Sequence, residues 1–227
     1  MISLNHSTAP TMSTTIEASQ LLLLLNWMSP AFPIGSFAYS HGLETAIVEN
    51  EITTQSEVES WIADLIAQGS GWNDAVLFAQ CWNGDAEELN ELALSMASSS
   101  ERYLETTQLG RSFAIAASVF ANVEFPDGDL AYPIAAGMAC KSMGVDQHSA
   151  LLAFLQGFAA AQVSVAVRLV PLGQTAGLRV LKNLMPIISK TANRAAAATL
   201  DDLGSCTLLA DVAAMNHEHL QPRIFRT

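Results

Sequence analysis

Apolar residues recur at intervals of three and four along most of the 227-residue chain, which is the spacing of amphipathic helices. Thr54 stands three positions before Glu57, the pattern of a capping box, and the apolar residues after them share one helical face. Asp85 is a similar start signal for another helix, and Asp146 precedes a third, which contains a long apolar stretch. These segments are predicted to be helices with one face in the core.

Proline and glycine divide the chain into helix-sized pieces. Residues 16–28 have helical composition until Pro30 and Pro33 interrupt them, and Ser36 is a suitable N-cap at which the helix resumes. Further interruptions are predicted at 126–128, 144, 171–173, 186 and 201–204. No stretch shows the period-two alternation of a strand. We therefore predict an all-α fold, a single globular domain of about nine or ten helices that occupies residues 19–215.

The two ends of the chain differ in composition from this domain. Residues 1–18 are rich in Ser and Thr and contain no Lys or Arg, so they lack the cationic region of a secretory signal and are predicted to be a mobile tail. Residues 216–227 combine two arginines with two apolar residues near their end. A basic and apolar end on an acidic protein is typical of an interaction segment, and a mobile partner-binding tail is predicted here.

Composition narrows the class of protein. The chain has 10 Lys and Arg against 22 Asp and Glu, a formal charge of -12, so a nucleic-acid backbone would be repelled over most of the surface. Charged residues make up 14% of the chain, below the roughly 25% of average soluble domains, while hydrophobic residues make up 50%. This surplus predicts a large core and some apolar surface that faces partners.

Cysteine usage and the longest apolar run bear on location. Cys81, Cys140 and Cys206 are far apart and form no CxxC pair, which favours a reducing, cytoplasmic environment. Residues 151–167 carry no charge and approach the length of a membrane span. The glutamines and alanines within this run favour a buried core helix instead. We predict a cytoplasmic protein that binds neither membranes nor nucleic acid.

Motifs for catalysis or metal binding are weak. The sequence has no GxSxG elbow, no cysteine near a histidine and no phosphate loop of the GxxxxGKS type. His41 and Glu44 could hold a cation from one helical face, but two ligands seldom retain a transition metal, so a polar packing pair is favoured. His217, Glu218 and His219 could bind nickel loosely, and solvated side chains are the favoured alternative. We therefore predict no metal site and no cofactor.

Arg168 ends the longest apolar run and precedes a Leu-Val-Pro-Leu-Gly-Gln sequence. An arginine in the last turn of a helix can satisfy the terminal carbonyl groups. It can equally present a fixed charge to a partner protein. The spacing of the sequence does not decide between these two roles.

Three stretches of the chain carry distinctive motifs. Residues 32–44 read FPIGSFAYSHGLE, residues 168–174 read RLVPLGQ, and residues 217–227 contain HE followed by RIFRT. Together they resemble the urease accessory protein UreF family, whose corresponding elements are FPxGxFxxSxGLE, a basic residue before PLGQ, and HE followed by RLFRS. Ile224 and Thr227 depart from the family's usual Leu and Ser. The matched positions are Phe32, Pro33, Gly35, Ser36, Phe37, Tyr39, Ser40, Gly42, Glu44, Arg168, Pro171, Gly173, Gln174, His217, Glu218, Arg223, Phe225 and Arg226.

The resemblance implies an all-α homodimer that joins a UreD (UreH) subunit and the GTPase UreG. This complex would dock on apo-urease during GTP-dependent nickel insertion. The matched residues would then be partner-binding or functional positions, and the chain would be a non-catalytic scaffold or regulator. Two other classes stay open: a helical enzyme whose residues meet only in space, and a nickel-binding carrier, which usually needs a denser tract of His or Cys.

Overall fold

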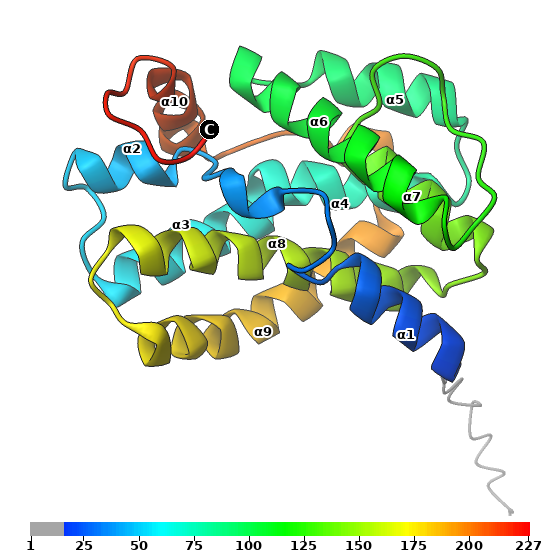
Figure 1. Ribbon diagram of the computed structural model, residues 1–227, viewed down its shortest axis with the longest axis horizontal. Coiled ribbons are helices and arrows are strands. Elements are labelled where there is room, and N and C mark those ends of the chain that lie inside the picture. Colours follow the sequence, from blue (N-terminus) through cyan, green and yellow to red (C-terminus); the bar gives the residue numbers. More distant parts are fainter. Residues whose placement is uncertain (1–15) are drawn as a thin grey trace, which may run out of the picture.

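The computed structural model describes residues 16–227, and within them helices joined by loops enclose one hydrophobic core (Figure 1). Ten α-helices and two 3-10 helices, η1 and η2, occupy this range, and no strand does. Their bounds are α1 Ala18–Trp27, η1 Ser36–Ala38, α2 Leu43–Val48, α3 Gln55–Gln68, α4 Ser70–Gln80, α5 Ala86–Ser95, α6 Ser100–Ala117, α7 Tyr132–Ser142, α8 Gln147–Leu169, α9 Gln174–Ala197, η2 Leu200–Asp202 and α10 Leu208–His217. The prediction of a single all-α domain is confirmed.

The central helix is α8. Among residues 16–227 it is the one helix long and apolar enough to cross a membrane, with 23 residues, a mean hydropathy of 1.8 and 50% of its most apolar window buried inside the protein. It packs against α9, α4, α3 and α2, and in Figure 1 it runs through the middle of the molecule. Phe154 of α8 stacks on Phe78 of α4 with the ring centroids 4.7 Å apart. The apolar run at residues 151–167 is therefore part of a core helix, as predicted.

The start signals read from the sequence form real caps. The Thr54 hydroxyl accepts a hydrogen bond from the Glu57 amide at 3.3 Å, and the Glu57 carboxylate accepts one from the Thr54 amide at 3.0 Å. Asp85 accepts from two amides in the first turn of α5, and Asp146 accepts from the Ser149 amide at the start of α8. Each such cap satisfies amides that have no partner inside the helix and contributes about 1 kcal/mol to stability.

The segment after α1 differs from the prediction. The helix expected to resume at Ser36 is only the single turn of η1, and α2 begins at Leu43. Gly35 and Gly42 both lie in the left-handed region, with φ of 80° and 78°. Glycine adopts this conformation readily because it lacks a Cβ atom, and two such residues interrupt the helical path. The FPIGSF stretch is therefore mostly an irregular connection.

Pro186 lies inside α9, where the sequence predicted a break. Proline cannot donate to the carbonyl group four residues earlier, which here belongs to Lys182. Both residues are exposed, so water can satisfy that carbonyl. On the opposite face Leu184 and Ile188 are buried and hold the helix to the core on either side of the proline.

The ends of the chain also differ from the predicted tails. Residues 1–15 of the expected N-terminal tail lie outside the described residues, and Glu17 is the N-cap of α1. Residues 216–227, called here the C-terminal segment, are packed on the helices: His217 and Thr227 are fully buried and Phe225 is 3% exposed. In Figure 1 the end of the chain lies between α10 and α2. The prediction of a mobile tail at residues 216–227 is therefore wrong, because polar and apolar partners for it exist within the same domain.

Candidate functional site

Arg168 connects the three motif stretches in space. It lies in the last turn of α8, where its Nε donates to the Ser164 carbonyl at 3.1 Å. Its Nη2 donates to the Phe37 carbonyl at 3.1 Å, and its guanidinium lies over the Phe225 ring, 4.9 Å from the centroid. Arg168 therefore donates to one carbonyl of its own helix and to one of the first motif stretch, not to the terminal carbonyls of α8. The same charge also stacks on an aromatic ring from the C-terminal segment, a favourable cation–π contact.

The main chain of the first stretch pairs with the end of the chain. The Arg226 amide donates to the Ala38 carbonyl at 2.9 Å, and the Ser40 amide donates to the Thr227 carbonyl at 2.9 Å. The Ser40 hydroxyl contacts the same Thr227 carbonyl. Two segments nearly two hundred residues apart in sequence thus hold each other through main-chain hydrogen bonds, which require a fixed backbone path on both sides.

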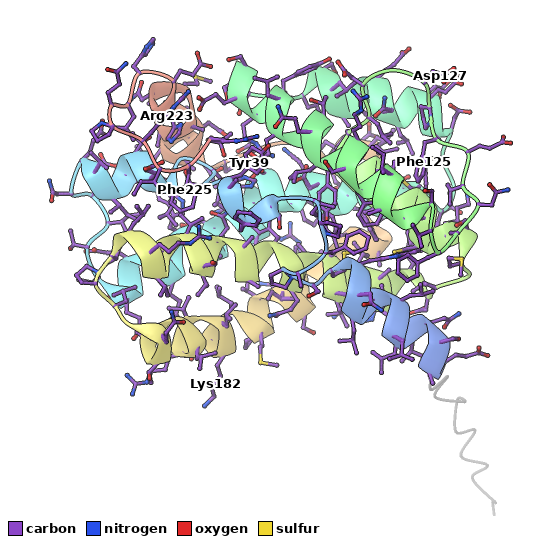
Figure 2. The ribbon with its side chains drawn as sticks, viewed as in Figure 1. Tyr39, Phe125, Asp127, Lys182, Arg223 and Phe225 are labelled. Atoms are coloured by element: carbon purple, nitrogen blue, oxygen red, sulfur yellow. The ribbon has the colours of Figure 1, made fainter. Side chains whose placement is uncertain are left out.

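Gln108 of α6 receives side chains from both segments. The Tyr39 hydroxyl donates to Gln108 Oε1 at 2.7 Å, and Arg226 Nη1 donates to the same oxygen at 3.0 Å. Tyr39 is 4% exposed, and burial raises the pKa of its phenol. Figure 2 places Tyr39, Arg223 and Phe225 in one region, between α10, α2 and α8.

Glu44 anchors the C-terminal segment to α2. Its carboxylate accepts hydrogen bonds from the Ile224 amide at 2.7 Å and the Phe225 amide at 2.9 Å. It also lies 2.8 Å from Nε2 of His217, whose Nδ1 is 2.7 Å from a Glu101 oxygen. Both imidazole nitrogens therefore face carboxylate oxygens, which can only accept, so the arrangement is satisfied when both nitrogens carry hydrogen. The buried His217 imidazole therefore bridges two acidic side chains.

Arg223 completes this group by pairing with Glu101. The two carboxylates thus have the His217 imidazole and the Arg223 guanidinium as partners, and buried acidic groups are tolerated when they are paired in this way. Glu218, next to His217, is exposed and accepts a hydrogen bond from the Ser100 hydroxyl. The C-terminal segment is thus joined to α6 as well as to α2.

A second buried group lies beside the first and is centred on Glu105 of α6. Glu105 is 2.8 Å from His41 Nε2, 2.5 Å from Arg102 Nη1, and accepts from the Thr227 hydroxyl at 3.2 Å. Burial alone would raise the pKa of Glu105, but Arg102 and His41 outweigh it and lower the pKa to about 2. Burial, then the Arg102 charge, lower the pKa of His41, which is therefore neutral at pH 7. Its Nδ1 is 3.2 Å from the Ser70 hydroxyl.

Asp74 lies at the edge of this group, 3.8 Å from Arg102 Nη2, and its titration is testable. Burial raises the pKa of Asp74 from 3.8 to about 6. The folded state therefore holds this proton more tightly than the unfolded chain does, and this residue makes stability increase as pH falls from about 6 to about 4.

Asp74→Asn is accordingly expected to raise the free energy of unfolding at pH 7 by about 1 to 3 kcal/mol. The difference between variant and wild type should shrink as pH falls from about 6 toward 4, because the wild-type carboxyl becomes protonated in the folded state. Urea denaturation of both proteins across this range measures it. A difference that does not change with pH would contradict the expectation.

Comparison with known proteins identifies the family. A family model named UreF matches residues 52–185. The chain is 45% identical over 208 residues to the urease accessory protein UreF of Cereibacter sphaeroides, an alignment that covers 91% of this chain and 98% of that relative. The chain belongs to the UreF family. It is also 44% identical over 223 residues to UreF of Rhizobium etli, covering 95% and 100% of the two chains, and 39% identical over 224 residues to UreF 1 of Brucella anthropi, covering 96% and 98%.

Half of the UreF motif positions meet at this site. Phe32 packs against Phe113 of α6 with the ring centroids 5.5 Å apart, and Ser36 starts η1. Pro33, Pro171 and Gly173 are exposed and lie in the connections before η1 and α9, and the exposed Gln174 is the first residue of α9. The motif residues that contact one another or a shared partner are Phe37, Tyr39, Ser40, Glu44, Arg168, His217, Arg223, Phe225 and Arg226.

The candidate metal pairs of the UreF-family sequence take other partners. His41 precedes α2 with a φ of 51°, so the prediction that it shares a helical face with Glu44 is wrong. His41 faces Glu105, whereas Glu44 faces His217. The expectation that His217 is solvated is also wrong, since it is fully buried. Within residues 16–227 no group of three or more His, Cys, Asp or Glu is placed to hold a metal ion.

Sequence reasoning missed the contribution of α6. Glu101, Glu105 and Gln108 recur at intervals of four and three, so they lie on one face of this helix. That spacing was a visible signal of a polar face. It did not identify the partners, because the residues that Glu101 and Glu105 bind lie up to 122 positions away.

Proposed function

We propose that this chain is a non-catalytic scaffold for urease maturation, which helps insert nickel into apo-urease together with a UreD/UreH-type protein and a UreG-type GTPase in the cytoplasm. The observation that carries the proposal is the junction of the three UreF motifs around the C-terminal segment. Their side chains hold α2, α6, α8 and α10 together in one surface. A rigid composite surface suits recognition of other proteins.

Apolar side chains are exposed beside this junction. Ile224 is 73% exposed and Leu208 of α10 is 72% exposed, although Phe225 and the alanines of α10 that face α2 are buried. Val212 and Met215 continue the exposed side of α10. Burying such side chains at an interface contributes on the order of 1.5 to 3 kcal/mol each. We assign this surface to the UreD-type partner.

Ile224→Asp combined with Leu208→Asp is expected to abolish co-purification with the UreD-type protein while the melting temperature stays near that of the wild type. The reason is that a carboxylate desolvated in an apolar interface is costly, whereas both residues face solvent in the free protein. Val119→Asp is the matched control, since Val119 is 81% exposed but lies just beyond the C-terminal end of α6. Retained binding by the double variant would overturn the assignment.

Point variants distinguish loss of partner binding from damage to the fold, which truncation of the C-terminal segment does not. Deleting residues 216–227 would remove His217 and Arg223, and would leave Glu44 and Glu101 buried without these partners. Loss of binding by such a truncated chain would then report damage to the fold as well as loss of contact.

A homodimer is the second part of the proposal, with α8 in its interface. An open apolar groove of about 700 Å³ runs between α1, α8 and α9, and Leu152 and Ala153 of α8 line it with Leu21, Leu25 and Met185. Leu25 is 63% exposed, and an apolar groove of this size is typical of a surface that another protein covers. Light scattering at micromolar concentration is expected to give the mass of a dimer, and Leu25→Glu the mass of a monomer. A monomeric wild-type mass would contradict this part.

The contact between Ser70 and His41 is the observation nearest to the alternative of a helical enzyme. Glu105, which would orient the imidazole, already binds Arg102 and Thr227 as well as His41. A carboxylate shared in this way is neutralised by the arginine and supports a structural network more than a proton relay.

A further inference from the structure

Positive charge is concentrated on one helix of this acidic protein. The helix α9 carries Arg179, Lys182, Lys190 and Arg194, and its sequence contains no Asp or Glu. The whole chain has 10 Lys and Arg and a formal charge of -12, so the remainder carries -16 once the +4 of α9 is taken away. A carboxylate-free cationic helix is therefore set into a strongly anionic molecule.

Three of these cations lie together on the outer side of α9. At 100° per residue, Arg179, Lys182 and Lys190 fall within an arc of about 80°, and they span about 16 Å along the helix axis. All three are exposed, and Figure 2 shows Lys182 pointing away from the body of the protein. Among the described residues 16–227 no ion pair involves any of them.

Arg194 differs from the other three because it takes part in the fold. It donates to the Ala67 carbonyl at 3.1 Å and lies over the Trp72 ring, 4.2 Å from the centroid. Glu59 of α3 is at the border of the cationic face, where it accepts a hydrogen bond from Asn183 at 2.9 Å. The free cations are therefore Arg179, Lys182 and Lys190, and we call this set the α9 basic face.

We propose that the α9 basic face docks a partner protein through a row of surface carboxylates about 16 Å long. The charge pattern matches such a partner, because opposite charges steer and orient two protein surfaces at short range. At physiological salt the Debye length is about 8 Å, so the anionic remainder of the chain is screened from a contact made at α9.

Other polyanions fit the α9 basic face less well. A membrane-binding helix inserts its apolar side into lipid, but Val180, Leu184 and Ile188 of α9 are buried in the core. Duplex DNA extends far beyond a contact of this length, so it would meet the anionic remainder of the protein. A protein partner confines its negative charge to the length of the face. This inference does not depend on the proposed role in urease maturation.

The test uses a fluorescent poly-L-glutamate peptide of about 6 residues as the probe, which spans about the length of the face when extended. It is measured with the full-length chain at physiological salt, where the anionic remainder of the protein is screened. Lys182→Gln with Lys190→Gln is expected to weaken binding roughly five-fold, the effect of losing two exposed ion pairs. The matched control is Arg111→Gln with Lys141→Gln, which removes the same charge from exposed positions on α6 and α7. That control should retain wild-type affinity within about two-fold.

Three results would overturn the proposal. Equal weakening by both double variants would mean that the probe senses only net charge. Tighter binding to duplex DNA or to phosphatidylserine vesicles than to poly-L-glutamate would replace the protein partner with another class. A changed oligomeric mass of the Lys182 and Lys190 variant would place the face between copies of this chain.

Discussion

His217→Ala is expected to lower the free energy of unfolding by about 3 to 5 kcal/mol, the usual cost of removing one member of a buried charge group. The imidazole lies 2.8 Å from Glu44 and 2.7 Å from Glu101, and it is fully buried. Alanine leaves these two buried carboxylates without the imidazole that bridges them, and Glu44, which binds the Ile224 and Phe225 amides, is no longer held in place by His217. We expect the C-terminal segment to detach before the rest of the domain unfolds.

Two measurements test this expectation. Urea denaturation gives the loss in free energy, and hydrogen exchange at the Ile224 and Phe225 amides reports whether the C-terminal segment opens locally. His219→Ala is the matched control, because His219 is exposed and only two positions away, and it should change stability by less than about 0.5 kcal/mol. Similar losses for the two variants would show that the buried charge group does not hold the segment.

Gly42→Ala is expected to destabilise the protein by about 2 to 5 kcal/mol and to displace α10. A Cβ atom at residue 42 would lie 2.7 Å from the Ala210 carbonyl oxygen and 2.8 Å from the Ala214 amide nitrogen. These are main-chain atoms, so α10 as a whole must move. The φ of 78° adds strain, because residues with a side chain rarely adopt it.

Gly35→Ala separates these two causes. Gly35 has nearly the same φ, 80°, but nothing lies within 4 Å of the position that its Cβ would take. Its substitution should therefore cost only the backbone strain, about 1 kcal/mol. Urea denaturation compares the two variants, and co-purification with the UreD-type protein reports whether the surface of α10 survives. Equal destabilisation by both would show that the close approach of α2 and α10 is unimportant.

Local features of the fold could be predicted from sequence because their causes lie within a few residues. Thr54 and Glu57 cap the same turn that they precede, and their reciprocal hydrogen bonds follow from a spacing of three. Pro186 misled this reasoning because its cost depends on exposure, which the neighbouring sequence does not reveal. The prediction of an all-α fold remained correct despite that error, since the buried residues on either side of Pro186 keep the helical spacing.

Only some residues of the candidate site, and none of their contacts, could be predicted from the sequence. The resemblance to a family picked out Glu44, Arg168 and His217 one by one, but their partners depend on how distant helices pack. His217 was interpreted as solvated because it precedes a polar and basic end of the chain. Its burial follows from Glu44 and Glu101, which lie 173 and 116 positions earlier. Interactions over such separations leave no periodic trace in the sequence.

The pairing of residues 38–40 with residues 226–227 has a consequence for biosynthesis. Ser40 binds a residue 187 positions later, and at 5 to 20 residues per second a ribosome needs about 10 to 40 s to reach it. During that interval the first motif has left the ribosome but lacks the hydrogen-bond partners that fix its backbone. The surface around Arg168 and Phe225 is therefore assembled last, so a prematurely terminated chain can form many of the helices and still present no finished surface to a partner.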